Sequence, residues 1–191
     1  MTTTPQDMLA FETADAWAQW LDAHHAQSSG IWLRLYKKDS GVATVTHEEA
    51  LSAALCYGWI DGQLKGLDQL SWIHRFTPRR PKSTWSKRNQ VLVAELAASG
   101  KMRPAGLREV EAAKADGRWD MAYDSPSKMT MPDDFLAALE QHEAARTFFA
   151  TLNKANTYAI AWRLQTAKKP ETRAKRMQAI IEMLSRGEAF H

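Results

Sequence analysis

The sequence of 191 residues holds one cysteine, Cys56, and no long apolar run. A single cysteine offers no disulfide framework, and no stretch approaches the roughly 18 to 20 consecutive apolar residues that span a bilayer. The opening residues, MTTTPQDM, also lack the basic and apolar regions of a secretory signal. We therefore expect a soluble, cytosolic protein without structural disulfides.

Common cofactor and catalytic motifs are missing as well. The chain has no Gly-x-Gly-x-x-Gly, no Walker-type loop that ends in Gly-Lys-Ser/Thr, no His-Glu-x-x-His and no Gly-x-Ser-x-Gly. His24 and His25 are neighbours on an expected helix, so they point in different directions, and no cysteine or third histidine stands at ligand spacing. We expect no cofactor and no metal site. Cys56 has no base placed beside it by the sequence, so we interpret it as a small buried side chain rather than a nucleophile.

Acidic residues are absent between Gln69 and Ala94, although six lysines and arginines lie between Arg75 and Arg88. The chain as a whole carries a formal net charge of only +3. Acids gather elsewhere, because the stretch from Leu107 to Ala145 holds nine acids against four bases. The basic stretch therefore either binds an anion or pairs with acids from another part of the chain.

The first half of the chain predicts helices and short strands in alternation. Thr13 caps a helix that runs to about His25, and Ile31 to Tyr36 alternates with the period of a half-buried strand. A capping box at Thr46 and Glu49 starts a second helix, which reaches Gly58. We expect Gly58 to Gly62 to form a turn that aims Asp61, and we expect Arg75 or a neighbouring base to hold its carboxylate. The segments Gln63 to Leu67 and Leu70 to Thr77 then form a β-hairpin.

The second half predicts helices throughout. Ser83 or Thr84 caps a helix that stops at Gly100, Pro104 opens another that ends at Gly117, and every element after Pro132 is helical. The predicted fold class is α+β, mostly helical, with a small antiparallel sheet of about three strands and an all-helical C-terminal part. We place an α+β domain at residues 1–130 and a helical C-terminal domain at residues 131–191.

The basic stretch is the candidate site. Arg79, Arg80 and Lys82 precede the expected helix start, where unpaired N–H groups and the positive end of the helix dipole attract anions. Basic residues in that place oppose the dipole, so a bound or paired anion is favoured. We predict no catalytic residue, and we predict ligand contacts from Trp59, Asp61, Trp72, His74, Arg75, Arg79, Arg80, Lys82, Ser83, Trp85 and Lys87.

Four segments carry a resemblance to a known family. They are CYGWIDG (56–62), RFTPRRPKSTWSKRN (75–89), the GRW and AYD motifs (117–124) and AKKPETRAKR (167–176). With these motifs the chain resembles the YdeI/OmpD-associated family, also called bacteriocin-protection proteins. The resemblance implies a bacterial cytosolic protein linked to tolerance of antimicrobial peptides or envelope stress, with no established reaction or cofactor. It also implies that residues 131–191 form the OmpD-associated domain.

Three classes of function stay open. The first is a binding module whose basic, Trp-rich site holds an anionic small molecule, a nucleic acid or an acidic protein surface. The second is an enzyme in which Asp61 or His74 acts as acid or base beside an arginine clamp. The third is a stress factor that only contacts proteins. An enzyme should gather Asp61, His74 and Arg79 in a concave pocket, a nucleic-acid binder should show an open basic stripe with aromatic rings, and an interaction protein should show an apolar patch.

Overall fold

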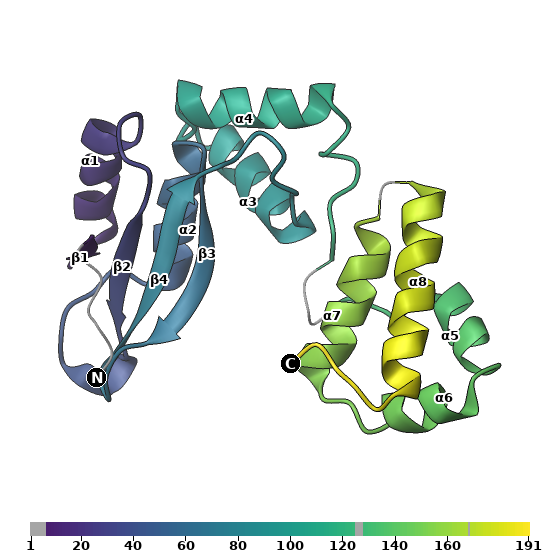
Figure 1. The fold of residues 1–191 in the computed structure, drawn as a ribbon. Helices are drawn as coiled ribbons and strands as arrows, with labels where there is room; N and C mark the ends of the chain where they lie inside the picture. Colours follow the sequence, from purple (N-terminus) through teal and green to yellow (C-terminus); the bar gives the residue numbers. More distant parts are fainter. Residues whose placement is uncertain (1–6, 125–127, 168) are drawn as a thin grey trace. The chain divides into compact units, whose positions relative to one another are not determined.

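The computed structural model describes residues 7–124, 128–167 and 169–191 (Figure 1). The chain divides into two compact units. Unit 1 holds the residues up to Trp85 together with Asn89–Asp120, and unit 2 holds Ser86–Arg88 together with Met121–His191.

Unit 1 is built on a mixed sheet. Its strands are β1 (Met8–Ala10), β2 (Ile31–Tyr36), β3 (Trp59–Gly66) and β4 (Ser71–Pro78), in the order β1-β2-β4-β3. Strands β2, β4 and β3 pair in the antiparallel sense, which confirms the predicted small sheet, while β1 adds a short parallel edge to β2. The sequence did not predict β1, because three residues are too few to show an alternation.

The predicted turn at Gly58 to Gly62 is wrong. Helix α2 (His47–Cys56) ends earlier, Gly58 alone takes a positive φ of 75°, and β3 begins directly afterwards at Trp59. Asp61 therefore lies inside a strand, opposite Phe76 of β4. The register shifts between Asp61 and Leu64, so a β-bulge separates this part of β3 from the rest.

The two faces of the sheet differ in burial. Helices α1 (Ala14–His24) and α2 pack on the inner face, where residues such as Trp17, Leu33 and Phe76 are fully buried. Figure 1 shows β2, β4 and β3 side by side with α2 behind them. We call the other side the outer face. The strand register places on it the half-buried or exposed residues Trp32, Arg34, Tyr36, Lys65 and Arg75, together with the buried Ile73.

Both predicted helix caps in this unit are present. The Thr13 hydroxyl accepts from the backbone N–H of Ala16, and Thr46 and Glu49 form a complete capping box. A 3-10 turn (Lys38–Ser40) follows β2, and α3 (Lys87–Ala98) and α4 (Pro104–Ala115) follow the sheet.

The predicted start of α3 at Ser83 or Thr84 is wrong, since the helix begins at Lys87. Trp85 lies in the preceding loop and packs against Trp119 with ring centroids 4.9 Å apart. The Arg118 guanidinium donates to the Ser83 carbonyl oxygen at 2.9 Å. These contacts hold residues 83–85 in a non-helical path, so the basic residues Arg79, Arg80 and Lys82 do not sit at a helix N-terminus.

Unit 2 contains four helices in the described residues: α5 (Asp133–Leu139), α6 (Glu143–Phe149), α7 (Lys154–Gln165) and α8 (Pro170–Ser185). The predicted helical end of the chain is thereby confirmed. Its core is formed by Phe135, Leu139, Ala145, Ile160, Leu164, Ile180, Ile181 and Leu184. The buried Asn156 side chain accepts from the backbone N–H groups of Phe190 and His191, which fastens the chain end to α7.

Across the parts of the chain that the structure describes, we find no helix with both the length and the apolar character needed to cross a bilayer.

Candidate functional site

Two of the tryptophans predicted to contact a ligand lie in the interior of unit 1. Trp59 and Trp85 are each 1% exposed. The indole of Trp59 donates to the His25 carbonyl oxygen at 3.1 Å, while Trp85 packs on Trp119. Both rings therefore have a packing role, and the structure gives neither an open ring face.

Arg79 is also buried, with 6% of its surface exposed. Its guanidinium carbon lies 3.5 Å from the centroid of the Trp85 ring, and its Nη1 donates to the Thr84 carbonyl oxygen at 3.2 Å. A cation over a desolvated indole ring stabilises the fold by about 2 kcal/mol. Arg79 thus fastens the loop that leads into α3.

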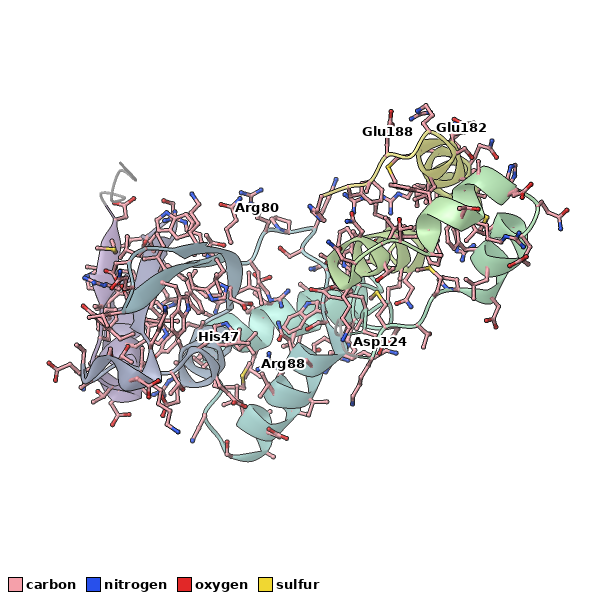
Figure 2. The ribbon with its side chains drawn as sticks, turned by 90° about the horizontal axis from the view of Figure 1, so that it is seen from below. His47, Arg80, Arg88, Asp124, Glu182 and Glu188 are labelled. Atoms are coloured by element: carbon pink, nitrogen blue, oxygen red, sulfur yellow. The ribbon has the colours of Figure 1, made fainter. Side chains whose placement is uncertain are left out.

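The remaining basic residues of this segment are more exposed. Arg80 and Lys82 lie at the surface, and Figure 2 shows the Arg80 side chain pointing away from the ribbon. The Ser83 hydroxyl accepts from the backbone N–H of Arg80 at 3.0 Å and so shapes the loop. Lys87 pairs with Asp124 at 2.9 Å. One cation of the basic segment, Lys87, is therefore paired with an acid from the acid-rich stretch Leu107 to Ala145, as the alternative interpretation predicted.

Arg75 lies on the outer face with its guanidinium carbon 5.8 Å from the centroid of the Trp32 ring. Lys65 lies over the same ring at 4.6 Å. On the same strand as Trp32, Arg34 lies 4.5 Å from the ring centroid of Tyr36. The outer face thus combines three cations with two half-buried aromatic rings, from three neighbouring strands.

Sequence reasoning missed four of these residues: Trp32, Arg34, Tyr36 and Lys65. The signal was present in part, because the alternation of Ile31 to Tyr36 places the first three on the polar side of one strand. Only the strand register shows that Lys65 and Arg75 reach the same side. Trp72, which was predicted as a contact, lies on the inner face opposite Leu35 and packs against the core.

On the inner face, three residues form a polar group that we call the His–Asp cluster: His47, Asp61 and His74. His47 is the first residue of α2, where the capping box fixes the helix start. Asp61 comes from β3 just before its bulge, and His74 comes from β4. The two imidazole rings stack with centroids 4.6 Å apart. Three elements therefore meet at this point of the fold.

Short distances join the members of the His–Asp cluster. Nε2 of His47 lies 3.0 Å from Oδ2 of Asp61, and Nε2 of His74 lies 3.8 Å from the same oxygen. Nε2 of His74 is also 3.2 Å from the Gly62 carbonyl oxygen. Of the two predicted alternatives for the partner of Asp61, Arg75 is wrong, because successive strand residues alternate and Arg75 points to the opposite face from His74. The base that contacts Asp61 is His47.

The surroundings set the protonation of the cluster. Burial alone would raise the pKa of Asp61, but the hydrogen bond to His47 and the nearby histidines outweigh burial, so the pKa lies below its ordinary value. Burial lowers the pKa of His74, and the neighbouring His47 lowers it further against the opposing effect of Asp61. At neutral pH the cluster therefore holds a carboxylate beside a neutral imidazole.

A metal ion could be held by this cluster, because each residue offers one donor atom and these atoms all lie within 4.8 Å of one another. From the sequence we expected no metal site, because only the adjacent His24 and His25 suggested one and neighbouring helix positions point in different directions. In the sequence, His47 is recognisable only as the residue that follows the helix cap at Thr46. The β3–β4 register brings the other two together.

A cavity of about 630 Å³ lies elsewhere in unit 1, lined by residues that include Asp15, Glu49, Cys56, Lys101 and Arg103. Burial raises the pKa of the Cys56 thiol, so the thiolate is disfavoured. Neither Asp61, His74 nor Arg79 lines this cavity.

Two family descriptions match the chain. The family described as "Domain of unknown function (DUF8412)" matches residues 9–109, which is more than half of the chain. The family described as "Bacteriocin-protection, YdeI or OmpD-Associated" matches residues 128–187 and confirms the resemblance found in the sequence. The CYGWIDG and RFTPRRPKSTWSKRN segments fall within the first match. No curated protein and no solved structure matches the chain.

Proposed function

We propose that this chain, which belongs to the DUF8412 family and carries a YdeI/OmpD-associated domain, binds single-stranded nucleic acid on the outer face of its sheet. The observation that supports the proposal is the pairing of aromatic rings with cations on that face. Lys65 and Arg75 lie over Trp32, and Arg34 lies over Tyr36.

The chemistry of the face suits a chain of bases and phosphates. Flat rings on an open sheet stack bases without regard to sequence, and cations between them neutralise the backbone. A small anion needs cations alone, so the alternation of rings and cations favours a nucleic acid.

The charge balance of the sheet supports the same partner. Asp61 is the one acid within β1, β2, β3 and β4, and it lies on the inner face. The nearest acid along the hairpin is Asp68, which pairs with Arg34 at 2.7 Å. Lys65 and Arg75 therefore supply positive charge on strands that carry no acid on the same side.

The family resemblance supports a cellular setting for this binding. The proposal places the protein in the bacterial cytosol, in tolerance of antimicrobial peptides or of envelope stress, and assigns no reaction to it. In that setting the outer face is a binding surface rather than an active site.

The test is titration of the full-length chain into a fluorescently labelled single-stranded oligonucleotide at several salt concentrations. Each phosphate contact on a single strand contributes about −0.7 to the slope of log K against log salt, so the two cations on this face without an acidic partner among the described residues, Lys65 and Arg75, predict a slope of about −1.4. The double reversal Lys65→Glu/Arg75→Glu should weaken binding at least tenfold. Trp32→Thr, which places another residue that favours strands at this position, should also weaken it because a stacking platform is lost.

A matched control has the same change in net charge. Arg80→Glu/Lys82→Glu alters two exposed cations of the loop before α3 and should weaken binding far less than the outer-face reversal. If the loop reversal weakens binding as much or more, the anion site lies in the loop and not on the sheet. If the parent chain does not bind the oligonucleotide even at low salt, the proposal fails.

A further inference from the structure

The His–Asp cluster has no part in the binding proposed for the outer face. Among the described residues it is the one group of three or more histidine, cysteine, aspartate or glutamate side chains whose donor atoms could hold a metal ion. Its members come from α2, β3 and β4, so the tertiary fold, rather than a local sequence motif, assembles it.

The spacing of the donor atoms is close to that of a metal site. Zinc binds nitrogen and carboxylate oxygen at about 2.0 to 2.2 Å, so two ligand atoms of a tetrahedral site lie roughly 3.3 Å apart. The two measured nitrogen–oxygen distances, 3.0 Å from His47 and 3.8 Å from His74 to the same Asp61 oxygen, lie on either side of that value. The His47 side chain is 29% exposed, so its ring can turn about its side-chain bonds toward an ion.

The chemical types of the donor atoms also fit. Imidazole nitrogen and carboxylate oxygen are atoms that bind zinc in proteins. Two imidazoles and one carboxylate form a ligand set typical of zinc and of divalent iron, nickel or cobalt, and less suited to magnesium or calcium, which prefer oxygen.

A second observation concerns the buried ring of His74. The residue is 7% exposed, and within the described part of the chain no hydrogen-bond partner reaches its Nδ1. A neutral imidazole carries one ring proton, so with that proton on Nδ1 the lone pair of Nε2 is available to an ion beside Asp61. The Gly62 carbonyl oxygen, 3.2 Å from Nε2, accepts a hydrogen bond only when the proton is on Nε2, so an ion bound at Nε2 would replace that contact.

The walls and the entrance of the cluster complete the site. Phe76 lies beside both imidazoles, with ring centroids 6.4 Å from His47 and 5.6 Å from His74, and gives the site an apolar floor. The Asp61 side chain is 25% exposed, so an ion can enter from solvent. We propose that His47, Asp61 and His74 bind one divalent transition-metal ion, such as Zn²⁺, and leave at least one coordination position open to solvent.

Calorimetric titration with zinc chloride tests the proposal directly. The full-length chain is used without a histidine tag, after treatment with a chelator and removal of that chelator. We expect one zinc ion per chain. Titration with Co²⁺ should add visible absorption bands, because cobalt bound by nitrogen and oxygen ligands is coloured and reports its own geometry.

Two partly exposed residues provide the variants. His47→Gln and Asp61→Asn each remove a ligand while keeping the size and polarity of the side chain, and each should weaken zinc binding at least tenfold and remove the cobalt bands. The control is His24→Gln on α1, an exposed histidine outside the cluster, which should bind zinc like the parent.

Two results would overturn the proposal. One is a parent chain that shows neither heat of binding nor cobalt bands at millimolar ion. The other is a His47→Gln chain that folds, as judged by circular dichroism, and binds zinc as tightly as the parent. Either result would identify the cluster as a polar network that only supports the sheet. Because Lys65 and Arg75 lie on the other face, oligonucleotide binding is measured separately and neither result bears on it.

Discussion

Unit 1 pairs an arginine with a tryptophan in two places, and the two pairs have different surroundings. Arg79 lies over Trp85 in the interior, with the ring 1% exposed and the arginine 6% exposed. Arg75 lies over Trp32 on the outer face, where both residues are half-buried. The same two residue types therefore fix a loop in one place and remain accessible to a ligand in the other. Burial separates these roles, and the sequence does not show it.

The largest difference is expected for the two rings. Trp85→Ala should lower the free energy of unfolding by about 3 to 5 kcal/mol, because a large buried side chain leaves a cavity. Trp32→Ala should lower it by about 1 kcal/mol, because the ring is already partly hydrated. Urea unfolding followed by circular dichroism measures both. Equal losses would mean that the outer face is as important for folding as the interior.

The two arginines give the next comparison. Arg79→Met keeps the length of the side chain but removes the charge over Trp85 and the hydrogen bond to Thr84, so unfolding should require about 2 to 4 kcal/mol less. Arg75→Met should lower the free energy of unfolding by less than about 1 kcal/mol. Its main effect should be weaker binding of nucleic acid. The same urea titration compares them. An Arg79→Met chain as stable as the parent would show that the buried cation is dispensable for the fold.

The inner face gives the stability of the protein a dependence on pH. Burial lowers the folded-state pKa of His74, whereas the unfolded chain takes up this proton near pH 6.5. The stability is complete above pH 6.5 and declines as the pH falls toward the folded-state pKa, since the unfolded state binds more protons in that interval. With a chelator present, the parent should therefore be less stable at pH 5.5 than at pH 7.5.

The His74→Asn variant isolates this contribution. Its loss of stability between pH 7.5 and pH 5.5 should be smaller than that of the parent, while His24→Gln should behave like the parent. Asp61 acts at lower pH, because its lowered pKa provides stability that is lost only as the pH falls through the folded-state value. An unchanged pH profile in His74→Asn would contradict a buried neutral imidazole.

Local signals in the sequence were sufficient for much of the fold. The hydroxyls of Thr13 and Thr46 cap the helices that they were expected to cap, and the alternation from Ile31 to Tyr36 is a strand. These features depend on residues within one helical turn or one strand. The start of α3 was misjudged because Ser83 bonds within a loop held by Arg118, a residue 35 positions later.

The candidate sites depend on contacts between distant segments, which explains what the sequence did not reveal. Asp61 and His74 were named as candidates, but His47 joins them only through the position of α2 on the sheet. Arg75 was named too, yet its neighbours Trp32 and Lys65 follow from the strand register. The residue types were sufficient to name candidate polar and charged side chains. Which of these side chains lie on the same face of the sheet follows from the pairing register of β2, β3 and β4.

The smallest expected effect concerns the contact between Lys65 and Trp32. The ammonium lies 4.6 Å from the ring centroid at an exposed site, where such contacts contribute about 0.5 to 1 kcal/mol. A double-mutant cycle with Lys65→Ala and Trp32→Thr should therefore give a coupling energy near the lower value. The parallel cycle with Arg79→Met and Trp85→Ala should give a larger one.

This small coupling has a consequence for binding. Stacking of one base on an aromatic ring contributes about 1 to 3 kcal/mol, so a base can displace the ammonium from Trp32 and leave it to pair with a phosphate. If the measured coupling energy instead exceeded the stacking contribution, the Lys65 ammonium would stay over the Trp32 ring and a base could not stack there. Trp32→Thr would then leave oligonucleotide affinity unchanged, and the outer face would bind nucleic acid through charge alone.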